Sequence, residues 1–360
     1  MLTDLARQIP LVTLLCLVFW LIAGCAAIPK YAELQANGPP HAALIAEFSL
    51  KDARQPFQSY FCDSLENYGQ EPVACLDWLL WPQQPQRVTE MSKPTHPLHL
   101  LLVTGAFGEC FAEQALPFEE AIADLRRQGH VVDTIVVAGQ SGVRHNAREI
   151  ADYVAQLDND IDLPLVIVGY SKGVADALDF LTEYPMLGAR TRALVSVAGA
   201  VRGSPLAARF EGTYGFFSHV PVEHCSRGDA KVLHALREDE REKWLADNAL
   251  PAAVRYYSVA AVASRSQIAR ALAPAWRMLR KTDMYNDGQL PLRNALVPGS
   301  TLLGYVHADH WGIALGLDDD LPFLMHRRDA RSFPRAALID AIARYVSADL
   351  HNAIGDTQSR

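Results

Sequence analysis

Short apolar runs recur along the chain from about residue 98 onward, and they alternate with segments of helical pattern. The runs are continuous rather than alternating, which is typical of strands buried on both faces of a parallel sheet. The strand candidates are, in chain order, LHLLLVTGA, HVVDTIVVAG, LPLVIVGYS, RALVSVAGA, VRYYSVAAVA and TLLGYV. This alternation predicts a doubly wound α/β fold with a mostly parallel sheet.

Two segments between these runs carry a helical stripe. In FEEAIADLRRQG, residues 118–129, apolar side chains stand at 118, 121, 122 and 125, and a glycine ends the pattern. NAREIADYVAQL, residues 146–157, has a similar stripe. We expect both segments to form crossover helices that pack on the sheet.

The interval between Gly203 and Ala252 is too long for a simple crossover. It contains an aromatic stretch, GTYGFFSHV, which we interpret as a loop, and a charged stretch of helical pattern, DAKVLHALREDEREKWLADN. We predict that residues 204–252 form a lid or cap above the active face, with a passive excursion as the alternative. The core domain is then 98–203 and 253–352.

The N-terminal part has a different pattern. Arg7 precedes an apolar run, Leu11 to Gly24, that is too short for a confident membrane-spanning helix and is typical of a targeting segment. Residues 25–43 contain Pro and Gly without a period and are typical of a tether. Residues 44–97 include strand-like and aromatic pieces, LIAEFSL and ACLDWLLW, and we expect them to pack on the core as an extension.

Leu21-Ile22-Ala23-Gly24-Cys25 resembles the lipobox of bacterial lipoproteins. The resemblance implies a signal peptide over residues 1–24, cleavage before Cys25 and acylation of its thiol. Since Ala26 rather than Asp follows, it also implies an outer-membrane lipoprotein that faces the periplasm and is anchored by its lipid. An uncleaved signal anchor, and an ordinary signal peptide in which Cys25 is incidental, remain alternatives.

Charge and cysteine content narrow the class of protein. The net charge of −8, without a Lys/Arg run, argues against nucleic-acid binding and against a polybasic membrane patch. After cleavage, the unmodified cysteines would be even in number, which suits an oxidising compartment. We predict a Cys62–Cys75 disulfide across a short polar segment, and Cys110 would then pair with Cys225. Buried free thiols are the alternative.

The sequence does not show the residue spacing that is typical of metal ligands. HVPVEHC, which contains His219, His224 and Cys225, lacks a second ligand pair at a distance usual for zinc. The acids Asp318 to Asp320 are consecutive, whereas a calcium loop alternates its ligands, so we interpret them as a solvated turn. We therefore predict neither a metal nor a cofactor.

The pentapeptide Gly169-Tyr170-Ser171-Lys172-Gly173 carries the chemistry. It follows a strand-like run, 163–168, and opens a helix-like run whose apolar positions 174, 177, 178 and 181 share one face. A serine on such a turn is held in a strained backbone, and the glycines permit close approach of neighbouring backbone. The amides at the helix start point toward charge that develops beside Ser171. We predict that Ser171 is a nucleophile rather than a serine in a simple turn.

With this motif in place, the sequence over about residues 98–350 resembles the α/β-hydrolase superfamily, and most closely its bacterial esterases and lipases. The resemblance implies the chain order nucleophile, acid, histidine. Asp287, in NDGQLP, resembles the Asp-Gly turn of lipases, with Asp283 as its rival. Of the histidines after the last strand, we favour His310, because it lies further along the loop and DHW resembles the family's histidine loop; His307 is the alternative.

The three residue types have distinct tasks. An imidazole must accept the serine proton, and a carboxylate fixes its tautomer. The oxyanion would be bound by the backbone amide of Lys172 and by that of Ala106 or Phe107, where Thr-Gly replaces the His-Gly of lipases. The Lys172 side chain is either a solvated residue paired with Asp176, or an ammonium that attracts an acidic substrate or lowers the pKa values of the site.

These predictions combine into a lipid-anchored serine hydrolase of the bacterial cell envelope. It would cleave carboxylic esters through an acyl-enzyme on Ser171, and the aromatic insertion suggests an apolar acyl group. Amides and thioesters are alternative substrates, since they would use the same groups. A non-catalytic envelope protein that uses this fold for binding or scaffolding is the alternative from another class.

Overall fold

The computed structural model describes most of the chain. The described residues are Leu34 and the ranges 41–71, 74–82, 96–113, 115–158, 161–217, 228–318, 320–329 and 331–358. The chain divides into two units, Met1–Asn37 and Gly38–Arg360, and all elements below belong to the second. The predicted signal peptide, Cys25, His219, His224 and Cys225 lie outside the described residues. Within the described ranges, every helix is too short or too polar to cross a bilayer.

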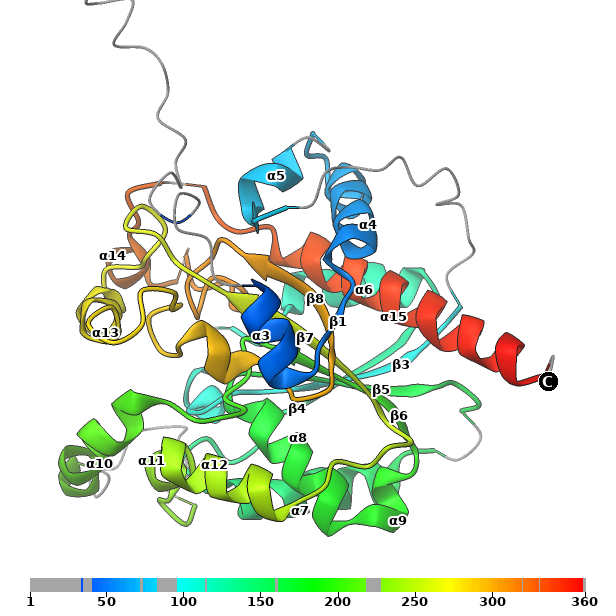
Figure 1. The fold of residues 1–360 in the computed structure, drawn as a ribbon, viewed down its shortest axis with the longest axis horizontal. Helices are drawn as coiled ribbons and strands as arrows, with labels where there is room; N and C mark the ends of the chain where they lie inside the picture. The colour runs from blue at the N-terminus through cyan, green and yellow to red at the C-terminus, as the bar shows by residue number, and fades with distance from the viewer. Residues whose placement is uncertain are drawn as a thin grey trace, which may run out of the picture. The chain divides into compact units, whose positions relative to one another are not determined.

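A central sheet organises Gly38–Arg360 (Figure 1). Its described part has eight strands, in the order β1-β8-β7-β6-β5-β3-β4, and β2 pairs antiparallel with β8. All other neighbours are parallel. The strands are β1 (Lys51–Asp52), β2 (Leu79–Leu80), β3 (His99–Val103), β4 (Val131–Ile135), β5 (Leu165–Tyr170), β6 (Thr191–Val197), β7 (Arg255–Ala261) and β8 (Thr301–Val306). Strands β3 to β8 coincide with the predicted runs, except that β6 begins one residue before its run, so the prediction of a mostly parallel α/β sheet is confirmed.

Helices cover both faces of this sheet. The α-helices are α3 (His41–Phe48), α4 (Arg54–Asn67), α5 (Cys75–Trp78), α6 (Glu119–Arg127), α7 (Val143–Gln156), α8 (Lys172–Glu183), α9 (Pro185–Gly188), α10 (Pro205–Phe217), α11 (Val232–Ala235), α12 (Glu238–Asp247), α13 (Ala273–Leu279), α14 (Pro322–Met325) and α15 (Arg335–Gln358). Two short 3₁₀ helices, η2 (Gly108–Phe111) and η3 (Leu292–Ala295), lie in loops. In Figure 1, α7, α8 and α9 lie on one face, and α4, α6 and α15 lie on the other.

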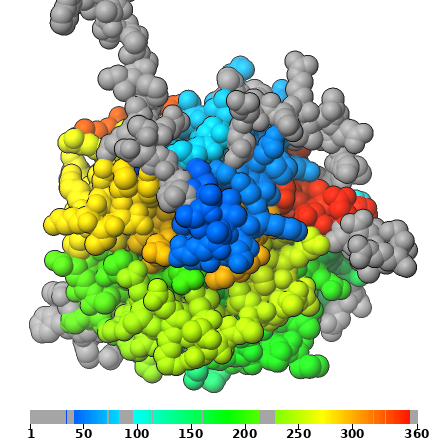
Figure 2. All heavy atoms as spheres, viewed as in Figure 1, coloured from blue at the N-terminus to red at the C-terminus, as the bar shows by residue number. Residues whose placement is uncertain are grey.

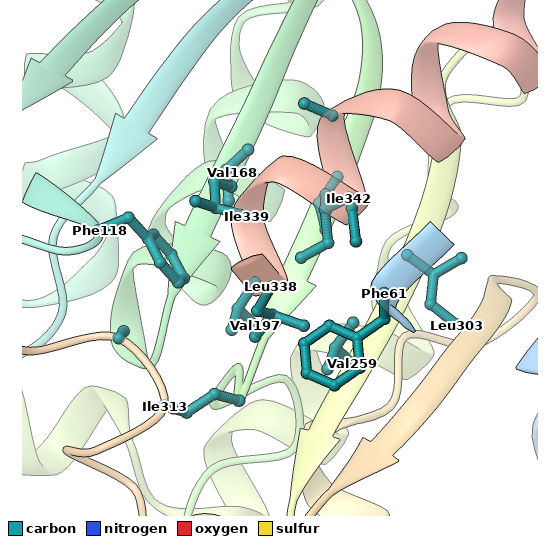
Figure 3. Packing of buried hydrophobic residues seen from close by; sticks show 14 of the residues in the cluster. Phe61, Phe118, Val168, Val197, Val259, Leu303, Ile313, Leu338, Ile339 and Ile342 are labelled. Carbon is teal, nitrogen blue, oxygen red and sulfur yellow. The ribbon is translucent and has the colours of Figure 1, made fainter. Parts of the chain in front are cut away.

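Each face has its own apolar core. Along β5, Leu165 and Ile167 belong to the core under α7 and α8, whereas Val166 and Val168 belong to the core under α4, α6 and α15. Figure 3 shows the second core, in which Leu338 and Ile339 of α15 pack beside Val168, Val197 and Val259. Because successive strand residues are buried on opposite faces, the strands read as continuous apolar runs.

The N-terminal extension differs from its prediction in local structure. LIAEFSL, which looked strand-like, lies mostly in α3, where Leu44 and Phe48 form a buried pair at helical spacing. Because α3 begins at His41, the last three residues of the predicted tether over residues 25–43 belong to this helix. The sequence pattern also missed α4, which packs against α15. On the face shown in Figure 2, the blue residues of the extension lie directly against the main domain.

The predicted disulfide between Cys62 of α4 and Cys75 of α5 is confirmed. Cys110 is disulfide-bonded as well, with a partner outside the described residues, so the free-thiol alternative is wrong for these three cysteines. The pairing of Cys110 with Cys225 stays a prediction.

Removing the Cys62–Cys75 bond is expected to destabilise the protein. The cysteines are 13 positions apart, and closing a loop of that size lowers the entropy of the unfolded chain by an amount worth about 3 kcal/mol. The double variant Cys62→Ala/Cys75→Ala, unfolded in urea, should lose about this free energy. A variant is preferable to a reducing agent, because the latter would also attack Cys110. An unfolding curve equal to that of the wild type would contradict the expectation.

The insertion is helical in its described part. α10, α11 and α12 occupy residues 205–217, 232–235 and 238–247, so the start of the aromatic stretch that we interpreted as a loop is helix. α12 is fixed to the core by Arg241, whose buried guanidinium lies 2.8 Å from Asp179 of α8 and donates to the carbonyl oxygen of Val201.

Candidate active site

The loops at the carboxyl ends of the central strands bring the predicted site residues together. Ser171 follows β5 directly, Gly105 and Ala106 follow β3, and His310 follows β8. Asp287 lies in the long connection between β7 and β8. In parallel α/β sheets this edge is where ligands bind.

Ser171 has the strained backbone that the motif predicts. Its φ is 54° and its ψ −124°, and its N–H and C=O bond to Val197 and Ala200. A Cβ on Gly169 would stand 2.8 Å from the nitrogen of Val174, and one on Gly173 would stand 2.5 Å from the carbonyl oxygen of Thr104. Both glycines of the motif are therefore required by close backbone contacts.

Ser171, His310 and Asp287 form a continuous hydrogen-bonded chain. The Oγ of Ser171 lies 2.8 Å from Nε2 of His310, and Nδ1 of His310 lies 2.6 Å from Oδ2 of Asp287. The other carboxylate oxygen accepts the N–H groups of Gln289 and Leu290 at 2.8 and 2.7 Å. With Nδ1 donating to the carboxylate, Nε2 is left to accept the serine proton.

The backbone of His310 is held on both sides by partners that the sequence pattern did not single out. Its N–H donates to the carbonyl oxygen of Asp287 at 2.8 Å. The hydroxyl of Tyr170, inside the pentapeptide, donates to the carbonyl oxygen of His310 at 2.7 Å. Burial raises the pKa of Tyr170, so this hydroxyl keeps its proton. The preceding Asp309 accepts the N–H of Gly312 and pairs with Arg327.

Asp283 and His307, the alternatives to Asp287 and His310, have other hydrogen-bond partners. Asp283 accepts the N–H of Tyr285 at 2.8 Å and stabilises its own turn. His307 is buried, and its Nε2 lies 2.8 Å from Oγ of Ser264. The histidine beside Ser171 is therefore His310, and the carboxylate beside that histidine is Asp287.

His307 makes the stability of the protein depend on pH. Burial, opposed by nearby Asp329 and assisted by Arg331, lowers its pKa from 6.5 to about 3. The unfolded chain thus binds a proton that the folded chain does not, and the stability present above pH 6.5 is lost as the pH falls toward 3. Between pH 7 and 5 we expect the wild type to lose about 2 kcal/mol more than His307→Gln in urea unfolding. His145→Gln, at an exposed position of α7, is the control; equal pH dependence in all three proteins would contradict the expectation.

Two of the three predicted oxyanion donors have free backbone amides. Among the described residues, no acceptor lies in hydrogen-bonding range of the N–H groups of Ala106 and Lys172. The N–H of Phe107, by contrast, donates to the carbonyl oxygen of Gly139 at 2.9 Å, in a turn where Phe107 has a φ of 59°. Phe107 is therefore wrong as a donor, because its amide is already bonded and faces Gly139.

The side chain of Lys172 is paired but not solvated. Its Nζ lies 2.6 Å from Oδ1 of Asp176, as the pairing alternative predicted, yet its exposure is 0%. Asn146 of α7 donates to the other oxygen of Asp176 at 2.9 Å, and α7 covers the pair. Burial raises the pKa of Asp176 to about 6. Because the ammonium points into this pair, the interpretation that it attracts an acidic substrate is also wrong.

Replacing Lys172 by Met is expected to lower the free energy of unfolding by about 3–5 kcal/mol, because it leaves a buried carboxylate without its counter-ion. The matched control is Lys243→Met, which removes an exposed pair of the same spacing with Asp247 and should change stability little. Urea unfolding of both variants gives the comparison. Equal losses in the free energy of unfolding of the two variants would contradict the prediction that the buried pair contributes more than the exposed one.

An apolar cavity of about 440 Å³ opens above Ser171 and His310. Leu206, Phe210 and Leu236 of the insertion line it, so the insertion is a wall of the site rather than a passive excursion. A second cavity, of about 450 Å³, lies at the amino ends of β5 and β6 and contains none of the predicted site residues.

The described residues hold no group of three His, Cys, Asp or Glu side chains that is arranged to bind a metal ion. Asp318 is half-buried, pairs with Arg327 and accepts from Ser332. Through these two bonds Asp318 links its loop to the segment that contains Arg327 and Ser332, which corrects its interpretation as part of a solvated turn.

Comparison with known proteins identifies the family. No family model and no curated protein matches the chain. Among solved structures, it is similar to the metagenomic carboxyl esterase MGS0156, with 36% identity over 84% of this chain and 94% of that one, at a TM-score of 0.77. The propeptide form of the Bacillus licheniformis lipase BlEst2 shares the fold, with 17% identity over 71% of this chain and 52% of that one, at a TM-score of 0.51. The mostly parallel sheet and the 36% identity to a solved carboxyl esterase lead to the same family. This chain belongs to the carboxyl esterases with the α/β-hydrolase fold, and it is a carboxylic ester hydrolase.

Proposed function

We propose that the protein cleaves carboxylic esters through a Ser171–His310–Asp287 triad and an acyl-enzyme on Ser171. The observation that carries this proposal is the pair of hydrogen bonds, 2.8 Å and 2.6 Å long, that joins the three side chains in series. All three side chains are buried, with Ser171 8% exposed, and Ser171 and His310 line the apolar cavity. Identity of 36% to a carboxyl esterase supports the reaction class and argues against a non-catalytic binding protein.

Acylation begins when His310 accepts the Ser171 proton at Nε2 and Oγ attacks the ester carbonyl carbon. The carbonyl oxygen becomes an oxyanion, and the free N–H groups of Ala106 and Lys172 stabilise it. Each such donor lowers the barrier by about 3 kcal/mol in comparable enzymes. His310 then gives its proton to the leaving alcohol oxygen as the C–O bond breaks, while Asp287 stabilises the imidazolium.

Deacylation repeats these steps with water. His310 takes a proton from the water, whose oxygen attacks the acyl carbon, and the second oxyanion occupies the same two amides. Collapse of this intermediate breaks the bond to Oγ and releases the carboxylic acid. Ser171 recovers its proton from His310, so the enzyme returns to its starting state.

A fluorophosphonate probe tests the nucleophile. The wild-type protein should be labelled and Ser171→Ala should not. Ser264→Ala is the matched control, since Ser264 also lies 2.8 Å from a histidine, His307, yet is buried and lies outside the cavity; it should label like the wild type. Labelling that survives in Ser171→Ala would refute the proposal.

We also propose that the mature protein is an outer-membrane lipoprotein that faces the periplasm and is acylated at Cys25. The support is the lipobox-like Leu21-Ile22-Ala23-Gly24-Cys25. Metabolic labelling with radioactive palmitate in a bacterial host should mark the wild type and not Cys25→Ser, and the labelled protein should fractionate with the outer membrane. Equal labelling of both proteins, or a soluble periplasmic wild type, would contradict this proposal.

A further inference from the structure

Two separate apolar clusters contribute residues to the lining of the cavity. The first, which we call the insertion wall, contains Phe107, Ala200, Ala207, Leu233, Leu236 and Leu290. The second, which we call the histidine wall, contains Ala115, Trp311, Leu315, Leu317 and Leu321. In Figure 1, α10 and α11 of the insertion lie below, and α14, which directly follows Leu321, lies above, at the same edge of the sheet.

The reaction divides a substrate between these walls. His310 must protonate the leaving oxygen, so the alcohol part has to lie beside its ring. Trp311, the residue directly after His310, belongs to the histidine wall. The oxyanion donor Ala106 packs with the insertion wall instead. With the carbonyl carbon at Ser171 and the alcohol part at the histidine wall, the insertion wall is left for the acyl part.

Neither wall carries a charged side chain. Among the described residues that line the cavity, none is Asp, Glu, Lys or Arg. The hydroxyl of Ser204, which also lines it, already donates to the carbonyl oxygen of Gln289 at 2.6 Å. Burying an unpaired carboxylate, phosphate or ammonium here would be costly, whereas hydrocarbon gains free energy on every methylene it buries.

We infer that the substrate is a neutral ester with hydrocarbon on both sides of the scissile bond, its acyl chain on the insertion wall and its alcohol chain on the histidine wall. This inference rests on the proposed function, since it places the reacting carbon at Ser171. It assigns Leu233 to acyl recognition and Leu321 to alcohol recognition, two positions at similar, partial exposure.

Two ester series test the assignment. One series varies the acid from butanoate to octanoate in ethyl esters, and the other varies the alcohol from ethanol to octanol in butanoate esters. For each protein, the ratio of kcat/KM for the longest ester to that for the shortest measures how well the chain is bound. Because both values come from the same variant, a loss of folded protein cancels in the ratio.

Leu233→Ala should lower the acyl ratio about tenfold and leave the alcohol ratio unchanged, and Leu321→Ala should do the reverse. Monoethyl octanedioate, in which a carboxylate replaces the terminal methyl group of ethyl octanoate, should react with a kcat/KM lower than that of ethyl octanoate by about 100-fold or more. Exchanged effects, equal effects on both ratios, or equal rates for the charged and neutral esters would overturn the inference. Hydrolysis that persists in Ser171→Ala would instead refute the proposed function.

Discussion

Replacing His310 by Gln is expected to lower kcat for a neutral ester by about 10⁶-fold, as the loss of the equivalent base does in a comparable serine protease. The amide can still contact Ser171, but it cannot accept a proton from Oγ or return one to the leaving alcohol. Steady-state hydrolysis of p-nitrophenyl butanoate measures the loss, and circular dichroism establishes that the variant is folded.

The double variant Ser171→Ala/His310→Gln is the control for this prediction. Nucleophile and base act as a unit, so the second substitution should reduce the remaining rate little further. His310→Gln with activity within tenfold of the wild type would show that another group is the base. If the rate loss in the double variant equalled the product of the losses in the two single variants, the two residues would act independently.

Replacing Asp287 by Asn is expected to lower kcat by about 10⁴-fold. An Asn amide can donate to Nδ1 of His310, which favours the tautomer that carries its proton on Nε2. That tautomer cannot accept the proton of Ser171. The change keeps the shape of the side chain, so the loss reports on the tautomer and on the charge rather than on packing.

Asp283→Asn is the matched control, because Asp283 lies four positions earlier and its carboxylate accepts the N–H of Tyr285. We expect its kcat to stay within about tenfold of the wild type, since it has no bond to His310. The same measurements on both variants separate the two acids. A larger loss in Asp283→Asn than in Asp287→Asn would reverse the assignment.

The sequence predicts the central sheet well because its signals are local. Strands such as β5 are buried on both faces, and this leaves continuous apolar runs that need no knowledge of partners. Ser171 is predictable for a related reason: Gly169 and Gly173 are each required by a backbone contact, so the motif records the turn itself. The resemblance to α/β-hydrolases then supplied the order in which Asp287 and His310 follow.

Features set by tertiary neighbours were not predictable. Lys172 reads as a solvated charge at a helix start, and only the packing of α7 over α8 shows that it is buried. The amide of Phe107 is occupied because Gly139, far along the chain, supplies an acceptor. Tyr170 holds His310 across 140 positions of sequence, a separation at which a single sequence contains no pattern.

Rapid acid quench during ester turnover tests most directly whether Ser171 carries the acyl group. Wild-type protein mixed with p-nitrophenyl octanoate, quenched within one turnover and digested, should yield a peptide that contains Ser171 and has gained the mass of one octanoyl group. The same peptide from Ser171→Ala should be unmodified. Octanoyl mass on another residue, or turnover by the wild type with no acylated peptide at any quench time, would contradict the acyl-enzyme mechanism.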